Sequence, residues 1–176
     1  MQTFLPYTNF ADSLDCLDYR RLGKQRVEAY QIINALEGKS KGWVNHPATK
    51  MWADNVEALK LYCNIAIDKW IARGYKNTMK FYSVKDTVTM PSWIGDLNLH
   101  ASHRSNLLRK DPEFYGQYGW KDPHDLEYVW LISSDRDWDL LIQEKVGRFS
   151  YVTRKEVRLD NWREHYDIPP EMYISL

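Results

Sequence analysis

The sequence has little of what secreted, membrane-spanning or cysteine-ligated proteins need. Its 176 residues include only two cysteines, Cys16 and Cys63, which is too few for a disulfide framework or a cysteine zinc site. No stretch approaches the roughly 18 uncharged apolar residues of a membrane span, and the N-terminus lacks the basic-then-apolar order of a signal peptide. We therefore expect a protein of the cytoplasm with no membrane contact.

Several motifs of enzyme active sites are also missing. The sequence holds no glycine-rich phosphate loop, no Gly-x-Ser-x-Gly elbow and no dinucleotide fingerprint. His100 and His103 stand three residues apart but lack the third and fourth ligands that a zinc site uses. The sequence therefore predicts no metal site.

Net charge is zero, yet the charges are unevenly distributed. Residues 1–121 carry 17 Lys and Arg against 12 Asp and Glu, whereas residues 122–176 carry 7 against 12. The basic residues concentrate in Arg20, Arg21, Lys24 and Arg26, whose helical spacing would let them neutralise adjacent phosphates. A basic body with an acidic tail is typical of nucleic-acid binding, and an ordinary solvated helix face is the alternative.

Aromatic residues are abundant, with eight Trp and twelve Tyr. The segment 109–120 interleaves Lys110 with Tyr115, Tyr118 and Trp120. Rings beside cations suit base stacking, and the alternative is that these rings seal the packing of helices. For the histidines of the sequence, contact with phosphate or sugar competes with a place in the core.

The periodicity predicts a mostly helical body. After an extended arm, a helix beginning at Asp12 or Ser13 would bury Leu14, Leu17, Val27, Tyr30, Ile33 and Leu36 and stop at Gly38. Two more helices are expected over about 48–73 and from Asp96 to Asp111, then a short helix over 135–146 and a β-rich segment over 148–159. The predicted fold class is all-α, with a compact three-helix body at residues 1–130 and a small mixed α/β appendage at 131–176.

Taken in order, several segments resemble the pyrimidine-dimer DNA glycosylase family of endonuclease V-like proteins. They are the N-terminal arm (residues 1–7), the first-helix segment 17–28, Asn45-His46-Pro47-Ala48-Thr49, the end of the second helix at Arg73-Gly74-Tyr75, and the stretch from His100 to Tyr115. The resemblance covers about residues 1–130, which it implies to be a glycosylase domain, and leaves 131–176 as an extension of unknown role.

The resemblance implies a DNA repair glycosylase with abasic-site lyase activity on pyrimidine dimers or another altered pyrimidine in double-stranded DNA. The family attacks the sugar with its N-terminal amine, and an α-amino group, with a pKa near about 8 against about 10.4 for lysine, is more often a free nucleophile. That amine belongs to Met1, or to Gln2 if the chain is trimmed. Arg21 stands where the family has its glutamate, so Glu28 is the expected acid/base, with Asp15 and Asp18 as lesser candidates.

The same reading implies a monomer that needs no cofactor, because the Schiff base itself is the electron sink. A non-catalytic DNA-binding protein on the same scaffold is the rival interpretation, and the acidic tail could serve as a partner-docking element or an autoinhibitor. The residues expected to bind DNA are Arg20, Arg21, Lys24, Arg26, His46, His103, Arg104, Lys110, Tyr115, Tyr118 and Trp120.

Overall fold

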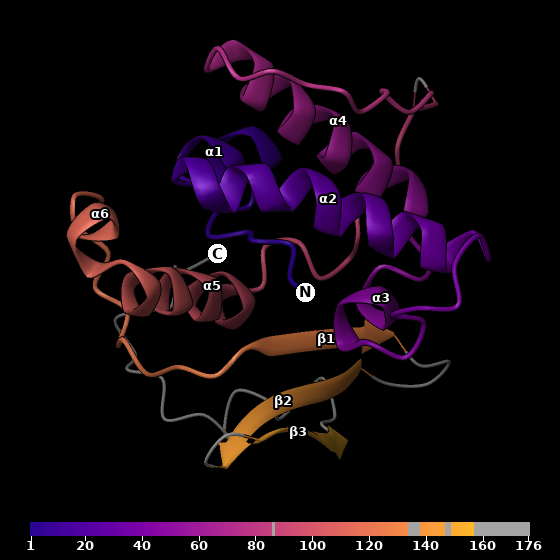
Figure 1. The fold of residues 1–176 in the computed structure, drawn as a ribbon. Coiled ribbons are helices and arrows are strands. Elements are labelled where there is room, and N and C mark those ends of the chain that lie inside the picture. The colour runs from indigo at the N-terminus through magenta and orange to yellow at the C-terminus, as the bar shows by residue number, and fades with distance from the viewer. Residues whose placement is uncertain (86, 134–137, 147–148, 157–176) are drawn as a thin grey trace.

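Helices dominate the computed structural model, which describes residues 1–85, 87–133, 138–146 and 149–156. A bundle of helices lies above a small antiparallel sheet (Figure 1). The elements are α1 (Phe10–Asp15), α2 (Tyr19–Leu36), α3 (Pro47–Met51), α4 (Val56–Ala72), α5 (Leu97–Lys110), α6 (Pro112–Gly116), β1 (Val129–Ser133), β2 (Trp138–Val146) and β3 (Phe149–Glu156).

Two of the three expected long helices are each divided in two. The first breaks at residues 16–18, where the Asp18 carboxylate caps α2 by accepting from the backbone N–H groups of Arg20 and Arg21. The second breaks after α3, and α4 begins only at Val56. Only α5, capped by Asp96, has the predicted bounds.

The predicted apolar stripe of the first helix was wrong in part, because the break rotates α2 relative to α1. Val27 and Tyr30 are 43% and 45% exposed, while Gln25 is 1% exposed. The face of α2 that packs on the core therefore carries a polar residue.

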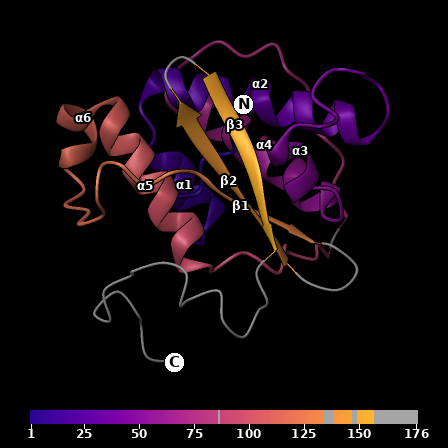
Figure 2. The ribbon, with the colours of Figure 1, turned by 90° about the horizontal axis from the view of Figure 1, so that it is seen from below.

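The C-terminal part that the structure describes is a three-stranded antiparallel sheet in the order β1-β2-β3. The helix expected over 135–146 was wrong, because β2 occupies most of that range, whereas β3 coincides with the expected β-rich segment. Figure 2 shows the strands crossing the lower face of the helices. β1 contacts α3 and α5, and its Trp130 is buried, so this strand crosses the expected domain boundary at residue 130 while packing on the helical body.

The N-terminal arm threads through the middle of the helical body (Figure 1). Thr3 and Leu5 are fully buried, and Gln2 and Phe4 are 5% exposed. The arm belongs to no helix or sheet, so its buried backbone groups need side-chain partners. Most of them have one: residues 2–7 bond to the side chains of Gln25, Glu28, Tyr62, His100, His103, Arg104 and Ser13.

These bonds explain why polar residues occupy the core faces of α2 and α5. The Gln25 amide accepts from Phe4 N (2.7 Å) and donates to the Gln2 carbonyl (3.0 Å). His103 Nδ1 accepts from Leu5 N and His100 Nδ1 donates to the Leu5 carbonyl, both at 2.7 Å. The arm is therefore fixed along its length, and the start of the chain has one defined position.

Within the described ranges, no helix combines the length and apolarity that crossing a membrane would require.

Candidate active site

The start of the chain opens into a cleft of about 470 Å³ between α2, α3 and α5. The three candidate catalytic residues, Met1, Gln2 and Glu28, all line this cleft. The full lining is Met1, Gln2, Phe4, Arg20, Arg21, Lys24, Gln25, Glu28, His46, Lys110, Asp111 and Tyr128.

One face of α2 supplies most of the polar lining. Arg20, Lys24 and Glu28 follow one another at four-residue spacing, which places them one above the other on a helix. Arg21 and Gln25 form the adjacent row, so both rows face the cleft. Arg26 falls on another side of the helix, which explains its absence from this set.

Glu28 is held directly against the start of the chain. Its Oε2 accepts a hydrogen bond from the backbone nitrogen of Gln2 at 3.0 Å, and Gln25 Nε2 lies 3.4 Å from the same oxygen. The α-amino group of Met1 is one peptide unit from this contact. A carboxylate and the chain's own amine therefore share one half-buried corner of the cleft.

His46 borders the same corner as a neutral imidazole. Burial, followed by the positive charge of the N-terminal ammonium, lowers the pKa of His46 to about 4. Its Nδ1 accepts from the backbone N–H of Ala48 (3.1 Å), so the ring proton resides on Nε2. His46 is therefore a hydrogen-bond donor at neutral pH, and its pKa records that the amine lies close by.

The cleft is electropositive. Burial and then the nearby charges of Arg21, Arg109 and Lys24 lower the pKa of Lys110, which Glu28 partly opposes. Mutual repulsion of this kind means that an anion entering the cleft relieves an existing electrostatic cost.

Arg21 has a structural role besides lining the cleft. Its guanidinium bonds Asp18 (2.5 Å) and lies 5.5 Å from the ring centroid of Tyr115. Burial would raise the pKa of Asp18, but hydrogen bonds from Tyr115 and Arg21 hold it below its usual range. Asp18 thus joins α2 to α6, and neither Asp18 nor Asp15, which pairs with Lys69 at 2.5 Å, lines the cleft.

Six of the residues expected to bind DNA lie away from the cleft. His103 and Tyr115 are fully buried, and they hold Leu5 and Asp18 respectively. Arg104 is engaged by both oxygens of Asp122 and by the Pro6 carbonyl. The remaining three are Arg26, which bonds Asn77 beside Trp70, and Tyr118 and Trp120, which stack on each other.

Gln25 and Tyr128 line the cleft without having been anticipated. Gln25 had a recognisable signal, since it is a polar residue in an otherwise apolar face of an amphipathic helix. Tyr128 had no such signal, because its position depends on a long-range contact. Tyr128 directly precedes β1, and its ring centroid lies 6.4 Å from that of Phe4 in the arm. Across the residues that the structure describes, no three His, Cys, Asp or Glu side chains cluster as a metal site would require.

The fold and the cleft together define a small helical protein that presents its own N-terminus in a cationic cleft. Residues 1–83 match the family model described as pyrimidine dimer DNA glycosylase. This confirms the family resemblance for that part of the chain, which includes α1–α4 and every cleft residue except Lys110, Asp111 and Tyr128.

A second comparison finds a flap endonuclease of Escherichia phage T5. It is 48% identical over 54 residues, which are 30% of this chain and 19% of that protein, so the chain spans about a fifth of that relative's length. No solved structure matches the chain.

Proposed function

We propose that this protein is a DNA glycosylase with abasic-site lyase activity, acting on an altered pyrimidine through its N-terminal amine. One observation carries the proposal: the Gln2 nitrogen lies 3.0 Å from Glu28 Oε2 inside a cleft lined by four cationic side chains. The family description, which names a pyrimidine dimer glycosylase, and the endonuclease name of the phage relative support DNA as the substrate.

The proposed reaction begins with the free amine attacking C1′ of the damaged nucleotide. The N-glycosidic bond breaks, its electron pair leaves with the pyrimidine, and the base takes up a proton. The amine loses a proton once it is bonded to C1′. The C1′–O4′ bond then breaks as O4′ takes up a proton, which opens the sugar ring and leaves a protonated Schiff base that acts as an electron sink. Removal of a C2′ proton expels the 3′ phosphate by β-elimination and cuts the strand.

Glu28 is the proposed proton carrier for these steps. Its carboxylate accepts the proton that the attacking amine releases and returns it to O4′ as the sugar ring opens. Glu28 is then negative again beside the positive Schiff base. Its hydrogen bond with the Gln2 nitrogen supports this role for either amine. If Met1 is retained, the nucleophile is one residue beyond the contact; if Met1 is removed, the Gln2 amine itself bonds Glu28.

The cations of the cleft are proposed to hold the phosphates on either side of the lesion. Arg20 and Lys24 are exposed and Lys110 extends over the same cleft from α5. Each neutralised phosphate releases counterions, which makes binding depend on salt. Gln2 adds a further donor: its Nε2 is buried and has no partner within the described part of the chain, so a pyrimidine carbonyl oxygen can accept from it.

Borohydride trapping with untagged protein tests this proposal. We expect a covalent adduct with an abasic duplex and with a dimer-containing duplex, none with undamaged DNA, and mass spectrometry should locate it on the N-terminal peptide. A blocked N-terminus should abolish trapping and leave DNA binding intact. Asp15→Asn is the matched control for Glu28→Gln, because Asp15 is an exposed carboxylate away from the cleft.

Two results would contradict the mechanism. An adduct that survives N-terminal blocking would mean that another amine, such as Lys110, is the nucleophile. Good binding without any adduct would favour the rival interpretation, a non-catalytic DNA-binding protein on the same scaffold.

A further inference from the structure

A row of aromatic rings and guanidinium groups runs along the outer side of α2 and the end of α4. Trp70 and Tyr75 stack with centroids 4.2 Å apart, and Tyr19 follows at 6.4 Å from Tyr75. Arg26 lies over Trp70 at 4.2 Å, and Arg20 lies over Tyr19 at 5.6 Å. We call these five residues the ring ladder.

The ring ladder is not explained by core packing. Tyr19 is 52% exposed and Tyr75 is 38% exposed. Their ring centroids are farther apart than those of the stacked pair Trp70 and Tyr75, so ring surface remains available between and beside them. These exposed rings, with interplanar angles of 33° between Tyr19 and Tyr75 and 27° between Trp70 and Tyr75, offer flat surfaces to a ligand that is itself flat.

A glycine allows this arrangement to lie close to α2. A Cβ atom at Gly23 would lie 3.0 Å from the Trp70 ring, so only glycine lets Trp70 pack against the helix there without a shift. Gly23 stands in the middle of α2, where glycine costs about 1 kcal/mol relative to alanine. The close packing of Trp70 on α2 therefore requires a residue that lowers the stability of the helix.

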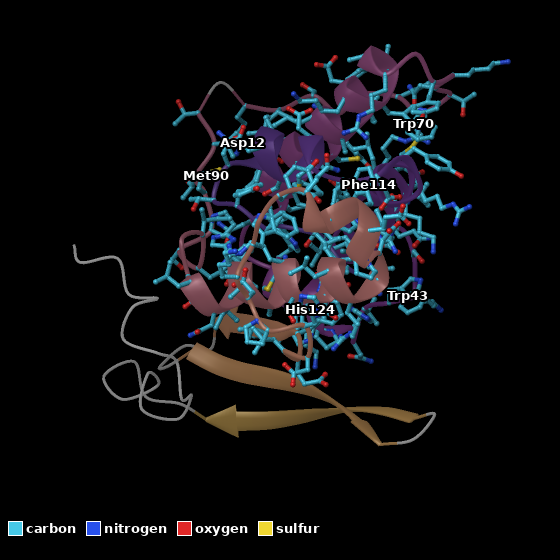
Figure 3. The ribbon with its side chains drawn as sticks, turned by 90° about the vertical axis from the view of Figure 1, so that its left-hand side faces the viewer. Asp12, Trp43, Trp70, Met90, Phe114 and His124 are labelled. Atoms are coloured by element: carbon cyan, nitrogen blue, oxygen red, sulfur yellow. The ribbon has the colours of Figure 1, made fainter. Side chains whose placement is uncertain are left out.

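The charge around the ring ladder favours a polyanion. Lys76 directly follows Tyr75, and the guanidinium groups of Arg20 and Arg26 lie on the rings of the ring ladder. Figure 3 places Trp70 on the same side of the molecule as Trp43, a 51% exposed ring that contacts His46 of the cleft. The ladder also joins the cleft directly, because Arg20 lines the cleft and its Nε bonds the Tyr19 hydroxyl at 2.9 Å.

We propose that the ring ladder binds unpaired nucleotides of a DNA strand that continues from the cleft. Bases in a duplex hide their faces against one another, whereas unpaired bases expose faces that stack on Tyr and Trp and lie beside Arg. This goes beyond the proposed function, since it requires only binding and holds whichever chemistry the cleft performs.

The test is fluorescence anisotropy with two undamaged probes, a labelled oligothymidylate of about 10 nucleotides, which fits one such stacking surface, and a blunt hairpin duplex. The double variant Tyr19→Ala/Tyr75→Ala should bind the single strand at least about tenfold more weakly, because each lost stack is worth about that factor. Its affinity for the duplex should change by less than about threefold, within the range of a weak exposed contact.

Two further variants separate stacking from other causes. Tyr19→Phe/Tyr75→Phe keeps both rings and should bind the single strand as the wild type does, although it loses the hydroxyl bond to Arg20. Phe81→Ala removes an equally exposed ring (52%) that stacks on no other ring within the described residues, and it should leave affinity unchanged. Thermal unfolding confirms that all variants fold.

Three outcomes would overturn the proposal. They are unchanged single-strand affinity in the alanine double variant, an equal loss for the duplex, or an equal loss in Phe81→Ala. None of them depends on incision, so failure here is distinguishable from failure of the proposed glycosylase reaction.

Discussion

Acidification should destabilise this protein through His103. The ring is fully buried, and its Nδ1 accepts from Leu5 N at 2.7 Å, so it is neutral with the proton on Nε2. Burial first, then the charges of His100 and Arg104, lower the pKa of His103 to about 3, against 6.5 for a free histidine. Protonation would replace the acceptor of Leu5 with a donor.

The sign and size of the effect follow from proton linkage. Between pH 6.5 and about 3 the unfolded chain binds a proton at this residue and the folded chain does not, so stability falls as the pH falls. At pH 5 the difference amounts to about 2 kcal/mol for His103 alone relative to pH 7.5. His100 contributes with the same sign because its pKa is also lowered, mainly by burial. His46 adds less than its pKa suggests, because its ring is partly exposed.

Urea unfolding at pH 7.5, 6 and 5 measures this directly. His103→Gln removes the titrating group while keeping a side-chain oxygen for Leu5, so its free energy of unfolding should vary by about 2 kcal/mol less over this range than that of the wild type. The matched control is His124→Gln, an exposed histidine, which should keep the wild-type dependence. Identical pH dependence in wild type and His103→Gln would refute the conclusion that His103 is neutral and accepts the hydrogen bond from Leu5 N.

Three further predictions concern the cleft. Glu28→Gln should lower the rate of Schiff-base trapping by about 10²- to 10⁴-fold, the usual contribution of a positioned acid or base, with little change in DNA affinity by gel shift. Gln25→Leu leaves Phe4 N and the Gln2 carbonyl without partners, so it should cost about 2–4 kcal/mol in chemical unfolding and slow trapping as well. Lys24→Ala and Lys110→Ala should each reduce the slope of log affinity against log salt by about 1, and an unchanged slope would exclude a phosphate contact.

The sequence predicted the helix-rich body because it depends on local patterns, whereas the interest in the residues at the chain start came from the family resemblance. Capping and periodicity determine α5, and the four-residue spacing of Arg20, Lys24 and Glu28 follows directly from a helix. The break before α2 was missed, because Asp18 caps this helix in a context fixed by Tyr115, a residue 97 positions away. β2 was missed as well, because strand pairing with β1 and β3 overrides weak local preference.

The buried histidines show a different limit of sequence reasoning. Residues His100 and His103 were open to a surface or a core interpretation, and the choice depends on where the arm lies. The arm has no periodicity of its own, and its path is set by partners on α2, α4 and α5. Once the arm is buried between these helices, its backbone requires polar side chains in the core, and the histidines meet that need.

If Arg21 stands at the family's glutamate position, as the resemblance implies, the role proposed for Glu28 fits the geometry of α2, because residues seven apart lie on nearly the same face of a helix. Glu28 stands seven residues after Arg21, which is close to two turns and about 10 Å along the axis. Both residues line the cleft, but they have different partners. Arg21 bonds Asp18 near the start of the helix, and Glu28 accepts a hydrogen bond from the Gln2 nitrogen. A carboxylate at position 21 would face Asp18 and Asp111 instead of pairing with them. For the proposed chemistry, a carboxylate at position 28 avoids that repulsion and lies against the Gln2 nitrogen near the start of the chain.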